Sequence, residues 1–179
     1  DPADIPVQLH VFDVEMPIIN KETQLYGYDT KELEGRIISY DLTRLLRGKN
    51  TLMQLKIKVE GNEAKTIPRE FKILPSFLRK MVRKGTNYVE SSFSCECKDA
   101  TIRIKPFLVT RRKVSRAVRN ALRIKVKEDL IEYSKDKTAE TMFRDILTGK
   151  LQKPLSLRLK KIYPLSLCEV RVLKVEKEK

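Results

Sequence analysis

The sequence predicts an α+β protein in which an antiparallel, β-barrel-like core is followed by a packed helical part and a returning C-terminal strand. Apolar residues recur with a period of two through most of the first hundred residues, with a helical period after residue 110, and with a period of two again near the C-terminus. No Gly/Ser linker or internal repeat separates these parts. We therefore expect a single body over residues 1–179, strand-rich over 7–110 and helix-rich over 111–165, with a C-terminal strand over 167–175.

The strand-rich part contains several short segments with alternating, β-branched or aromatic residues, which are typical of strands. The first three are Val7–Val11, Arg36–Tyr40 and Leu55–Val59, and the last of these runs into a turn at Glu60–Glu63. Two further pairs follow, a continuing meander and a hairpin around Lys98–Ala100; they are Ala64–Ile67 with Phe71–Ile73, and Tyr88–Cys97 with Thr101–Val109. The hairpin turn lacks the glycine that would make this signal strong.

Four helices are predicted from their start and stop signals. Pro75 can open a short helix that Gly85 closes, with the cations Arg79, Lys80, Arg83 and Lys84 on its outer side. Ser115 is a candidate N-cap for a long helix to about Tyr133, in which Val118, Leu122 and Val126 form an apolar stripe beside Ala117, Ala121 and Ile124. Two shorter helices follow, from about Thr138 to Gly149 and from Leu151 to Ile162.

Tyr163-Pro164 should stop the last helix, because proline cannot donate a helical hydrogen bond. We expect this joint to turn the chain directly into the final strand. Ile162 and Leu165 would then close the core, and Tyr163 would be packed by its ring with its hydroxyl held by a neighbour.

The charge is strongly uneven along the chain. In total, 38 Lys+Arg stand against 24 Asp+Glu, a balance of +14, yet residues 1–60 are slightly acidic at −2 and residues 61–179 carry +16. The stretch Thr101–Lys127 holds ten cations and no acidic residue. Such a block repels itself in a folded protein, so it favours an anionic partner, with nucleic acid ahead of a membrane surface. A solvated basic face that only aids solubility is the alternative.

Arginines dominate this block and should form a row on the long helix. At about 100° per residue, Arg116, Arg119, Arg123 and Lys127, together with Arg112 if it is helical, fall within an arc of roughly 80°, nearly opposite the apolar stripe. Planar guanidinium groups match phosphate oxygens bidentately. Because Trp is absent and Asn120 is the only amide on the exposed face, backbone contacts to folded RNA fit better than base stacking or the reading of DNA bases. The candidate RNA-binding residues are Arg103, Lys105, Arg111, Arg112, Lys113, Arg116, Arg119, Arg123, Lys127, Arg79, Lys80, Arg83 and Lys84.

The sequence lacks the motifs that most classes of enzyme require. The six glycines are isolated, so neither a phosphate-binding loop nor a dinucleotide fingerprint can form. The lone histidine, His10, lies in a strand-like run, and Asp13 with Glu15 is best explained as a pair of solvated edge charges. Cys95, Cys97 and Cys168 could join His10 as soft ligands, but one intervening residue in a strand is poor zinc spacing, so buried thiols are the favoured interpretation. We expect no catalytic residue, metal or cofactor.

The same survey bears on location. No apolar run is long enough to cross a bilayer, and the acidic start lacks the features of a secretory signal. Three cysteines do not make a disulfide framework for a chain of this length. These observations favour a cytoplasmic protein.

Several segments resemble a known family. Leu33–Ile38 followed by Asp41-Leu42, the helix Leu74–Lys84, Thr110–Lys113 leading into Ser115–Arg123, and above all Lys161–Leu165 with Glu169–Leu173 are similar to the archaeal and eukaryotic small-subunit ribosomal proteins called S-one-e or S-three-A. The eukaryotic member is also named v-fos transformation effector protein. The similarity extends from about Val7 to the C-terminus. The basic tail and Trp that usually open the family are missing here. The short connection Lys113-Val114 is more archaeal in style, but a compacted eukaryotic ribosome could show the same, so both origins stay open.

The resemblance implies a β-barrel-like core with packed helices, bound to ribosomal RNA on the platform of the small subunit near the messenger exit. It implies neighbouring platform proteins as partners, with messenger RNA and initiation factors as further candidates, a location on cytoplasmic ribosomes, and no catalytic role. Two alternatives remain open at this point: a stand-alone RNA-binding module, and a translation-factor docking adaptor whose main partner is a protein.

Overall fold

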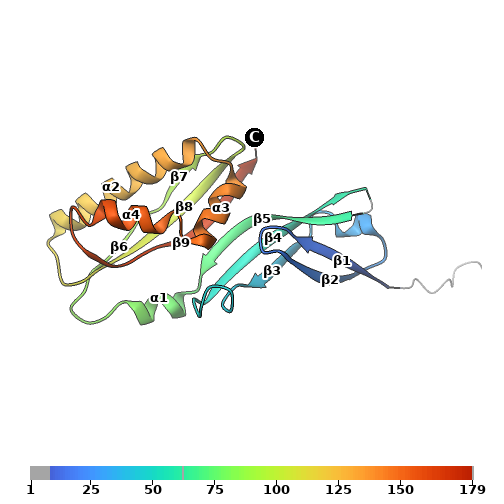
Figure 1. Cartoon of the computed structure of the whole chain (residues 1–179), viewed down its shortest axis with the longest axis horizontal. Helices are drawn as coiled ribbons and strands as arrows, with labels where there is room; N and C mark the ends of the chain where they lie inside the picture. The colour runs from blue at the N-terminus through green and yellow to red at the C-terminus, as the bar shows by residue number, and fades with distance from the viewer. Residues whose placement is uncertain (1–8, 62, 179) are drawn as a thin grey trace, which may run out of the picture. The chain divides into compact units, whose positions relative to one another are not determined.

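The computed structural model describes residues 9–61 and 63–178, which contain nine β-strands, four α-helices and one short 3₁₀-helix. The nine strands form one sheet with the order β2-β1-β5-β9-β8-β6, in which β3 pairs with β4, β4 also pairs with β5, and β7 pairs with β8 (Figure 1). Contacts divide the chain into two compact units, one of residues 1–40 and 54–69 and one of residues 41–53 and 70–179. Each unit is described separately below.

The first unit is a small group of strands over an apolar core. β1 (His10–Met16) pairs antiparallel with β2 (Lys21–Gly27) and runs parallel to the start of β5 (Glu63–Ile73). The unit also holds the 3₁₀-helix η1 (Thr30–Leu33), most of β3 (Ile37–Asp41) and much of β4 (Thr51–Glu60). Its buried core consists of Val14, Leu33, Ile57 and Ala64, drawn from four different elements.

The second unit is organised around the two longest antiparallel partners. β8 (Ala100–Thr110) pairs with β9 (Leu165–Glu178) along its whole length, and it also pairs with β6 (Tyr88–Glu90) and β7 (Phe93–Glu96). The end of β5 pairs with β9 through Glu70, Phe71 and Lys72. Buried apolar side chains alternate along β8, so that Ile102 and Ile104 are fully buried while Arg103 and Lys105 are half-exposed.

Four helices belong to the second unit: α1 (Pro75–Met81), α2 (Arg116–Lys135), α3 (Ala139–Thr148) and α4 (Gln152–Leu159). α2 packs on β6 and β7, whereas α3 and α4 pack on β9. Local signals set their ends: Ser115 and Thr138 cap α2 and α3 through their hydroxyls, and Gly149 ends α3 in the left-handed conformation at φ 74°. No helix of the described residues is both long and apolar enough to span a membrane.

The predicted α+β class is confirmed, but the barrel-like core is not. β2 and β6, at the two ends of the strand order, do not pair with each other, so the sheet of the described residues stays open. The segments predicted over Ala64–Ile67 and Phe71–Ile73 form one strand, β5, because Pro68, Arg69 and Glu70 between them do not interrupt it. The strand predicted over Tyr88–Cys97 is instead divided into the shorter β6 and β7. β2 was not predicted, since Lys21–Gly27 contains only one aliphatic residue, Leu25. Residues 7 and 8 of the first predicted strand lie outside the described residues.

The segment around Tyr163-Pro164, which joins the last helix to the final strand, differs from the prediction in where the helix ends and in which side chains are buried. α4 ends at Leu159, five positions before Pro164, because a tighter turn takes over in which the Ile162 amide bonds to the Leu159 carbonyl at 2.9 Å. Ile162 is 39% exposed, so its predicted core position is wrong. Tyr163 is only half-buried, and no hydrogen bond of its hydroxyl is found within the described residues. The final strand begins at Leu165, directly after Pro164 and two residues earlier than predicted, and it continues to Glu178 instead of Val175.

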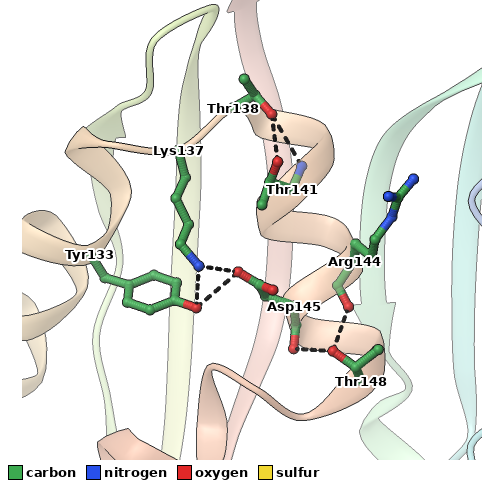
Figure 2. A network of polar contacts seen from close by, with 7 residues as sticks. All are labelled: Tyr133, Lys137, Thr138, Thr141, Arg144, Asp145 and Thr148. Atoms are coloured by element: carbon green, nitrogen blue, oxygen red, sulfur yellow. Dashed lines mark hydrogen bonds and ion pairs between the residues drawn. The ribbon is translucent and has the colours of Figure 1, made fainter.

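A polar network fixes α2 to α3 (Figure 2). The Tyr133 hydroxyl donates to Asp145 Oδ2 at 2.8 Å, and Lys137 Nζ donates to the Tyr133 hydroxyl at 2.5 Å and also to the Asp145 carboxylate. The ammonium group lies 3.9 Å from the centre of the Tyr133 ring. Burial alone would raise the pKa of Asp145, but the hydrogen bonds from Lys137 and Tyr133 outweigh it and leave that pKa below its usual value.

We expect Asp145→Asn to lower the free energy of unfolding at neutral pH by about 2 kcal/mol, because Lys137 and Tyr133 lose a charged acceptor. The lowered pKa makes this contribution fully present above the ordinary Asp value of about 3.9, and it disappears as the pH falls through the folded-state value. The difference between wild type and variant should therefore shrink in acid. Urea unfolding at a series of pH values measures it.

Glu140→Gln is the matched control, because Glu140 lies on the same helix in an exposed pair with Arg144 at 3.0 Å. It should cost less than about 0.5 kcal/mol at any pH. Equal effects of the two substitutions would contradict a special role for the network.

Candidate nucleic-acid interface

The basic segment begins in a loop that neighbouring residues hold rigidly. The Asn87 carbonyl accepts from the Thr110 amide at 2.8 Å, and the Thr110 hydroxyl donates to the Arg112 carbonyl at 2.7 Å. Asn87 Oδ1 accepts from the Val114 amide at 2.9 Å, on the far side of the loop. Arg111, Arg112 and Lys113 therefore extend from a loop whose two ends are tied to one residue, Asn87.

The orientation of α2 differs from the helical-wheel prediction. Leu122, Val126 and Leu130 are buried, as expected for the core face. Ile124 is 51% exposed, and Ala117 and Ala121 are also exposed, so these three residues do not belong to the core stripe. The arginine row consequently lies on the flank of α2 beside the sheet and not on the side opposite the core. The wheel placed Arg116, Arg119, Arg123 and Lys127 on one arc, but Arg112 lies in the loop before α2 and is not part of it. The wheel also did not show which of the two apolar arcs packs inward.

This flank position gives Arg119 and Arg123 contacts with the protein. Arg123 Nε donates to the Glu90 carbonyl of β6 at 3.2 Å. Arg119 is half-buried, and its Nε is buried without a hydrogen-bond partner in the described structure. Arg119 Nε is therefore enclosed by the protein, whereas Arg123 is exposed, and no further hydrogen bond of either guanidinium group is found within the described residues.

These side chains border a hollow of about 570 Å³ on the surface of α2. Its lining residues are Arg116, Ala117, Arg119, Asn120 and Arg123. Three guanidinium groups and one amide can each donate hydrogen bonds, and no carboxylate lines this space. The arrangement is suited to an anion with several oxygen acceptors, such as a phosphate group.

Most of the remaining cations of the block are exposed and have no carboxylate partner in the described residues. They are Arg111, Arg112, Lys113, Arg116 and Lys127. Lys125 is not one of the candidate RNA-binding residues. It differs from these cations because it pairs with Asp129 at 3.2 Å. The structure therefore keeps most of the predicted charge available on one flank of α2 and the loop before it.

The candidates on β8 are separated from this flank. Arg103 Nε pairs with Glu176 Oε1 at 2.5 Å, and Ser94 donates to the other oxygen of that carboxylate at 2.8 Å. Cys95, paired in register with Ile102, bonds to Ser134 of α2 and so lies on the sheet face that α2 covers. Because neighbours along a strand point to opposite faces, Arg103 and Lys105 lie on the other face. One continuous surface cannot use both groups of candidates.

The predicted basic side of the helix after Pro75 is present only in part, because α1 ends at Met81: Arg79 and Lys80 lie on α1, whereas Arg83 and Lys84 lie in the turn after it. Arg79, Lys80, Arg83 and Lys84 are exposed, and none of them has a carboxylate partner in the part of the chain described by the structure. α1 lies well away from α2 in Figure 1. It is therefore a second basic surface of the same unit and not an extension of the α2 flank.

The cysteine, histidine and acidic residues considered as catalytic groups or metal ligands do not come together in a site within the described residues. Cys95 and Cys97 are buried, and burial raises the pKa of the Cys95 thiol; burial raises the pKa of Cys168 to about 12. His10 is exposed on β1 with its ring 6.4 Å from that of Phe12, and Asp13 and Glu15 are exposed. Within residues 9–61 and 63–178, no group of three or more His, Cys, Asp or Glu side chains could hold a metal ion.

Three residues near the basic flank were not predicted. Asn87 ties the loop and Glu90 binds Arg123 through its carbonyl and Arg171 through its carboxylate at 2.9 Å. Asn120, considered only as a possible base reader, lines the hollow. Asn87 directly precedes a strand and so gave a turn signal, but no local pattern could connect Glu90 to Arg123, 33 residues later.

A comparison with protein-family models identifies the chain. The model of the Ribosomal S3Ae family matches residues 10–179. The chain belongs to the Ribosomal S3Ae family. The resemblance seen in the sequence is thereby confirmed, and the residues of this S3Ae protein that match come from both units.

Individual relatives of this S3Ae protein come from archaea. It is 30% identical over 162 residues to "Small ribosomal subunit protein eS1" of Nanoarchaeum equitans, and the aligned region covers 86% of this chain and 81% of that protein. A protein of the same name from Methanothermobacter thermautotrophicus is 30% identical over 133 residues, covering 71% and 68%. The namesake from Pyrobaculum arsenaticum is 27% identical over 169 residues, covering 93% and 74%.

For this S3Ae protein we expect Arg119→Met to leave the free energy of unfolding unchanged or to raise it by up to about 1 kcal/mol, because it removes a buried nitrogen without a partner. Arg123→Met, at a neighbouring position on the same flank, should lower it by about 1 kcal/mol through loss of the bond to the Glu90 carbonyl. Urea unfolding of both variants tests this. A greater loss for Arg119→Met would show that its guanidinium is structurally required.

Proposed function

We propose that this chain is a structural constituent of the small ribosomal subunit that binds ribosomal RNA and has no catalytic role. Membership of the Ribosomal S3Ae family and relatives named as small-subunit proteins support the ribosomal role. The single observation that supports RNA binding is the α2 flank, where three arginines converge on a hollow free of carboxylates. Double-stranded RNA presents phosphates and ribose at regular spacing, and these match a row of guanidinium groups.

The finer assignment is also part of the proposal. We place the protein on the platform near the messenger exit, on cytoplasmic ribosomes, with neighbouring platform proteins, messenger RNA and initiation factors as further partners. Arg111, Arg112 and Lys113 would extend the α2 contact toward a second phosphate, since their loop is rigid and their charges are not paired. Both units would serve as one ribosomal protein body.

Two other basic surfaces would then have different uses. The four cations on α1 and the turn after it would bind a separate RNA segment, because no carboxylate of the described residues compensates them. Arg103 has its charge satisfied by Glu176 and is the weakest of the candidates, whereas Lys105 on the same face has no such partner. The proposed order of importance is therefore the α2 flank first, α1 second and β8 last.

Replacing Arg116, Arg119 and Arg123 together by Gln should flatten the dependence of RNA affinity on salt. Each lost phosphate contact removes roughly 0.7 to 0.9 from the slope of log K against log salt, so about two to three units should be lost. Titration of labelled small-subunit RNA at several salt concentrations measures this slope.

The control carries Lys150→Gln, Lys153→Gln and Lys160→Gln, which remove the same charge from exposed positions around α4. Its slope should change by less than about one unit. An unchanged slope in the arginine variant would contradict the assignment of the RNA contact to α2. The contact would then lie at α1 and the turn after it, and the double variant Arg79→Gln with Arg83→Gln should flatten the slope instead.

Sedimentation of small subunits after a high-salt wash tests the ribosomal role itself. A structural constituent remains with the subunit, because many contacts hold it. A stand-alone RNA-binding module or a factor-docking adaptor would leave in the wash. Loss of the protein at a salt concentration that retains the other ribosomal proteins would refute the proposed function.

A further inference from the structure

The first unit exposes large apolar side chains on one face of β1 and β2. Val11 and Tyr26 are direct partners across the two strands, and they are 50% and 62% exposed. Leu9 and Tyr28, just beyond the ends of these strands, are 56% and 47% exposed. Because direct partners in an antiparallel pair share a face, Val11 and Tyr26 form a continuous apolar surface. Exposed patches of this kind mark interaction sites.

The same face carries carboxylates in the positions that follow. Asp13 lies opposite Gln24, and Glu15 lies directly opposite Glu22; all four side chains are exposed. Two like charges at directly opposed positions destabilise a sheet. Their side chains also border a hollow of about 400 Å³ at the β1–β2 turn. The free protein therefore holds an unfavourable pair that a cationic group placed between the two carboxylates would relieve.

Two cations lie on β1, β2 and the start of β5, and neither forms an ion pair with Glu15 or Glu22 in the described structure. Lys65 of β5 is the register partner of Glu15, but it is paired with Glu63 at 3.2 Å. Lys21 of β2 also borders the hollow, and its ammonium group donates to the Tyr40 hydroxyl at 2.9 Å. Across these strands, the four carboxylates Asp13, Glu15, Glu22 and Glu63 thus outnumber two ammonium groups. An RNA backbone or an anionic membrane would be repelled here, in contrast to the α2 flank.

We propose that this face, defined by Val11, Asp13, Glu15, Glu22 and Tyr26 and here called the acidic–apolar face, docks a protein segment in which Lys or Arg side chains accompany aliphatic or aromatic ones. The apolar residues bury against Val11 and Tyr26, and the cations lie between Glu15 and Glu22. This inference rests on the proposed function, which supplies a setting rich in basic proteins. Residues 1–8 of the chain itself carry Asp1 and Asp4 and no cation, so their charge does not complement this face.

The test places the photo-reactive amino acid p-benzoylphenylalanine at Tyr26 in the full chain and irradiates intact cells that express it. The tagged chain is recovered under denaturing conditions and the cross-linked partner is sequenced by mass spectrometry. We expect a protein segment with Lys or Arg beside apolar side chains. A cross-link to RNA, to residues 1–8, to an acidic segment, or to nothing would overturn the proposal.

Charge reversal makes the test specific to the acidic–apolar face. Glu22→Lys should reduce the yield of the cross-link by about fivefold or more, because it repels a basic partner. The free variant should melt at the wild-type temperature or above, since the substitution removes the opposed pair. Glu132→Lys, an equal change at an exposed position of α2, is the matched control and should leave the yield unchanged.

An equal yield with Glu22→Lys, or an equal reduction by both variants, would refute the docking assignment. The high-salt wash separates failure of the proposed function from failure of the docking proposal. A chain that is absent from washed subunits but still cross-links a basic segment in cells refutes only the ribosomal role. A chain that stays in the subunit without that cross-link refutes only the docking.

Discussion

The pairing of β8 with β9 is the constraint on which the second unit depends. It joins Ala100–Thr110 to Leu165–Glu178, segments separated by the whole helical part of the chain. Closing such a long loop costs conformational entropy, which the ladder and the side chains buried along it must repay. The helices that lie between these strands are therefore confined to the space above one sheet, and α2, α3 and α4 bury their apolar sides there.

The same ladder contains irregularities with a clear chemical cause. Its register shifts between Lys105 and Pro106, where proline has no amide hydrogen to donate to β9. Arg171 lies opposite this shift and pairs with Glu90, the residue whose carbonyl also accepts from Arg123. A backbone defect in the sheet thus lies beside the residues that help to orient the basic flank of α2.

Placing arginines on a flank and not on the outermost side of a helix has a physical advantage. The hydrogen bond from Arg123 Nε to the Glu90 carbonyl holds one guanidinium group in place before a ligand binds, so less side-chain freedom is lost on binding. Arg119 shows the cost of this arrangement, since its Nε is buried without a partner in the described structure. Charge is divided accordingly: the first unit presents carboxylates on β1 and β2, and the second presents cations on α1 and α2.

The sequence by itself determined those features that depend on neighbours along the chain. Ser115, Thr138 and Gly149 set helix ends through their own side chains or backbone freedom, and alternation in Leu55–Val59 and Thr101–Val109 identified strands correctly. Only the tertiary structure decided which arc of α2 faces the sheet. The arcs Val118–Leu122–Val126 and Ala117–Ala121–Ile124 are both apolar, and the periodicity of a helix does not indicate which of two apolar arcs packs against another element. It also decided that the sheet stays open, and that Asn87, Glu90 and Glu176 meet arginines far along the chain. Such contacts arise when separate strands are brought together, and local periodicity carries no information about them.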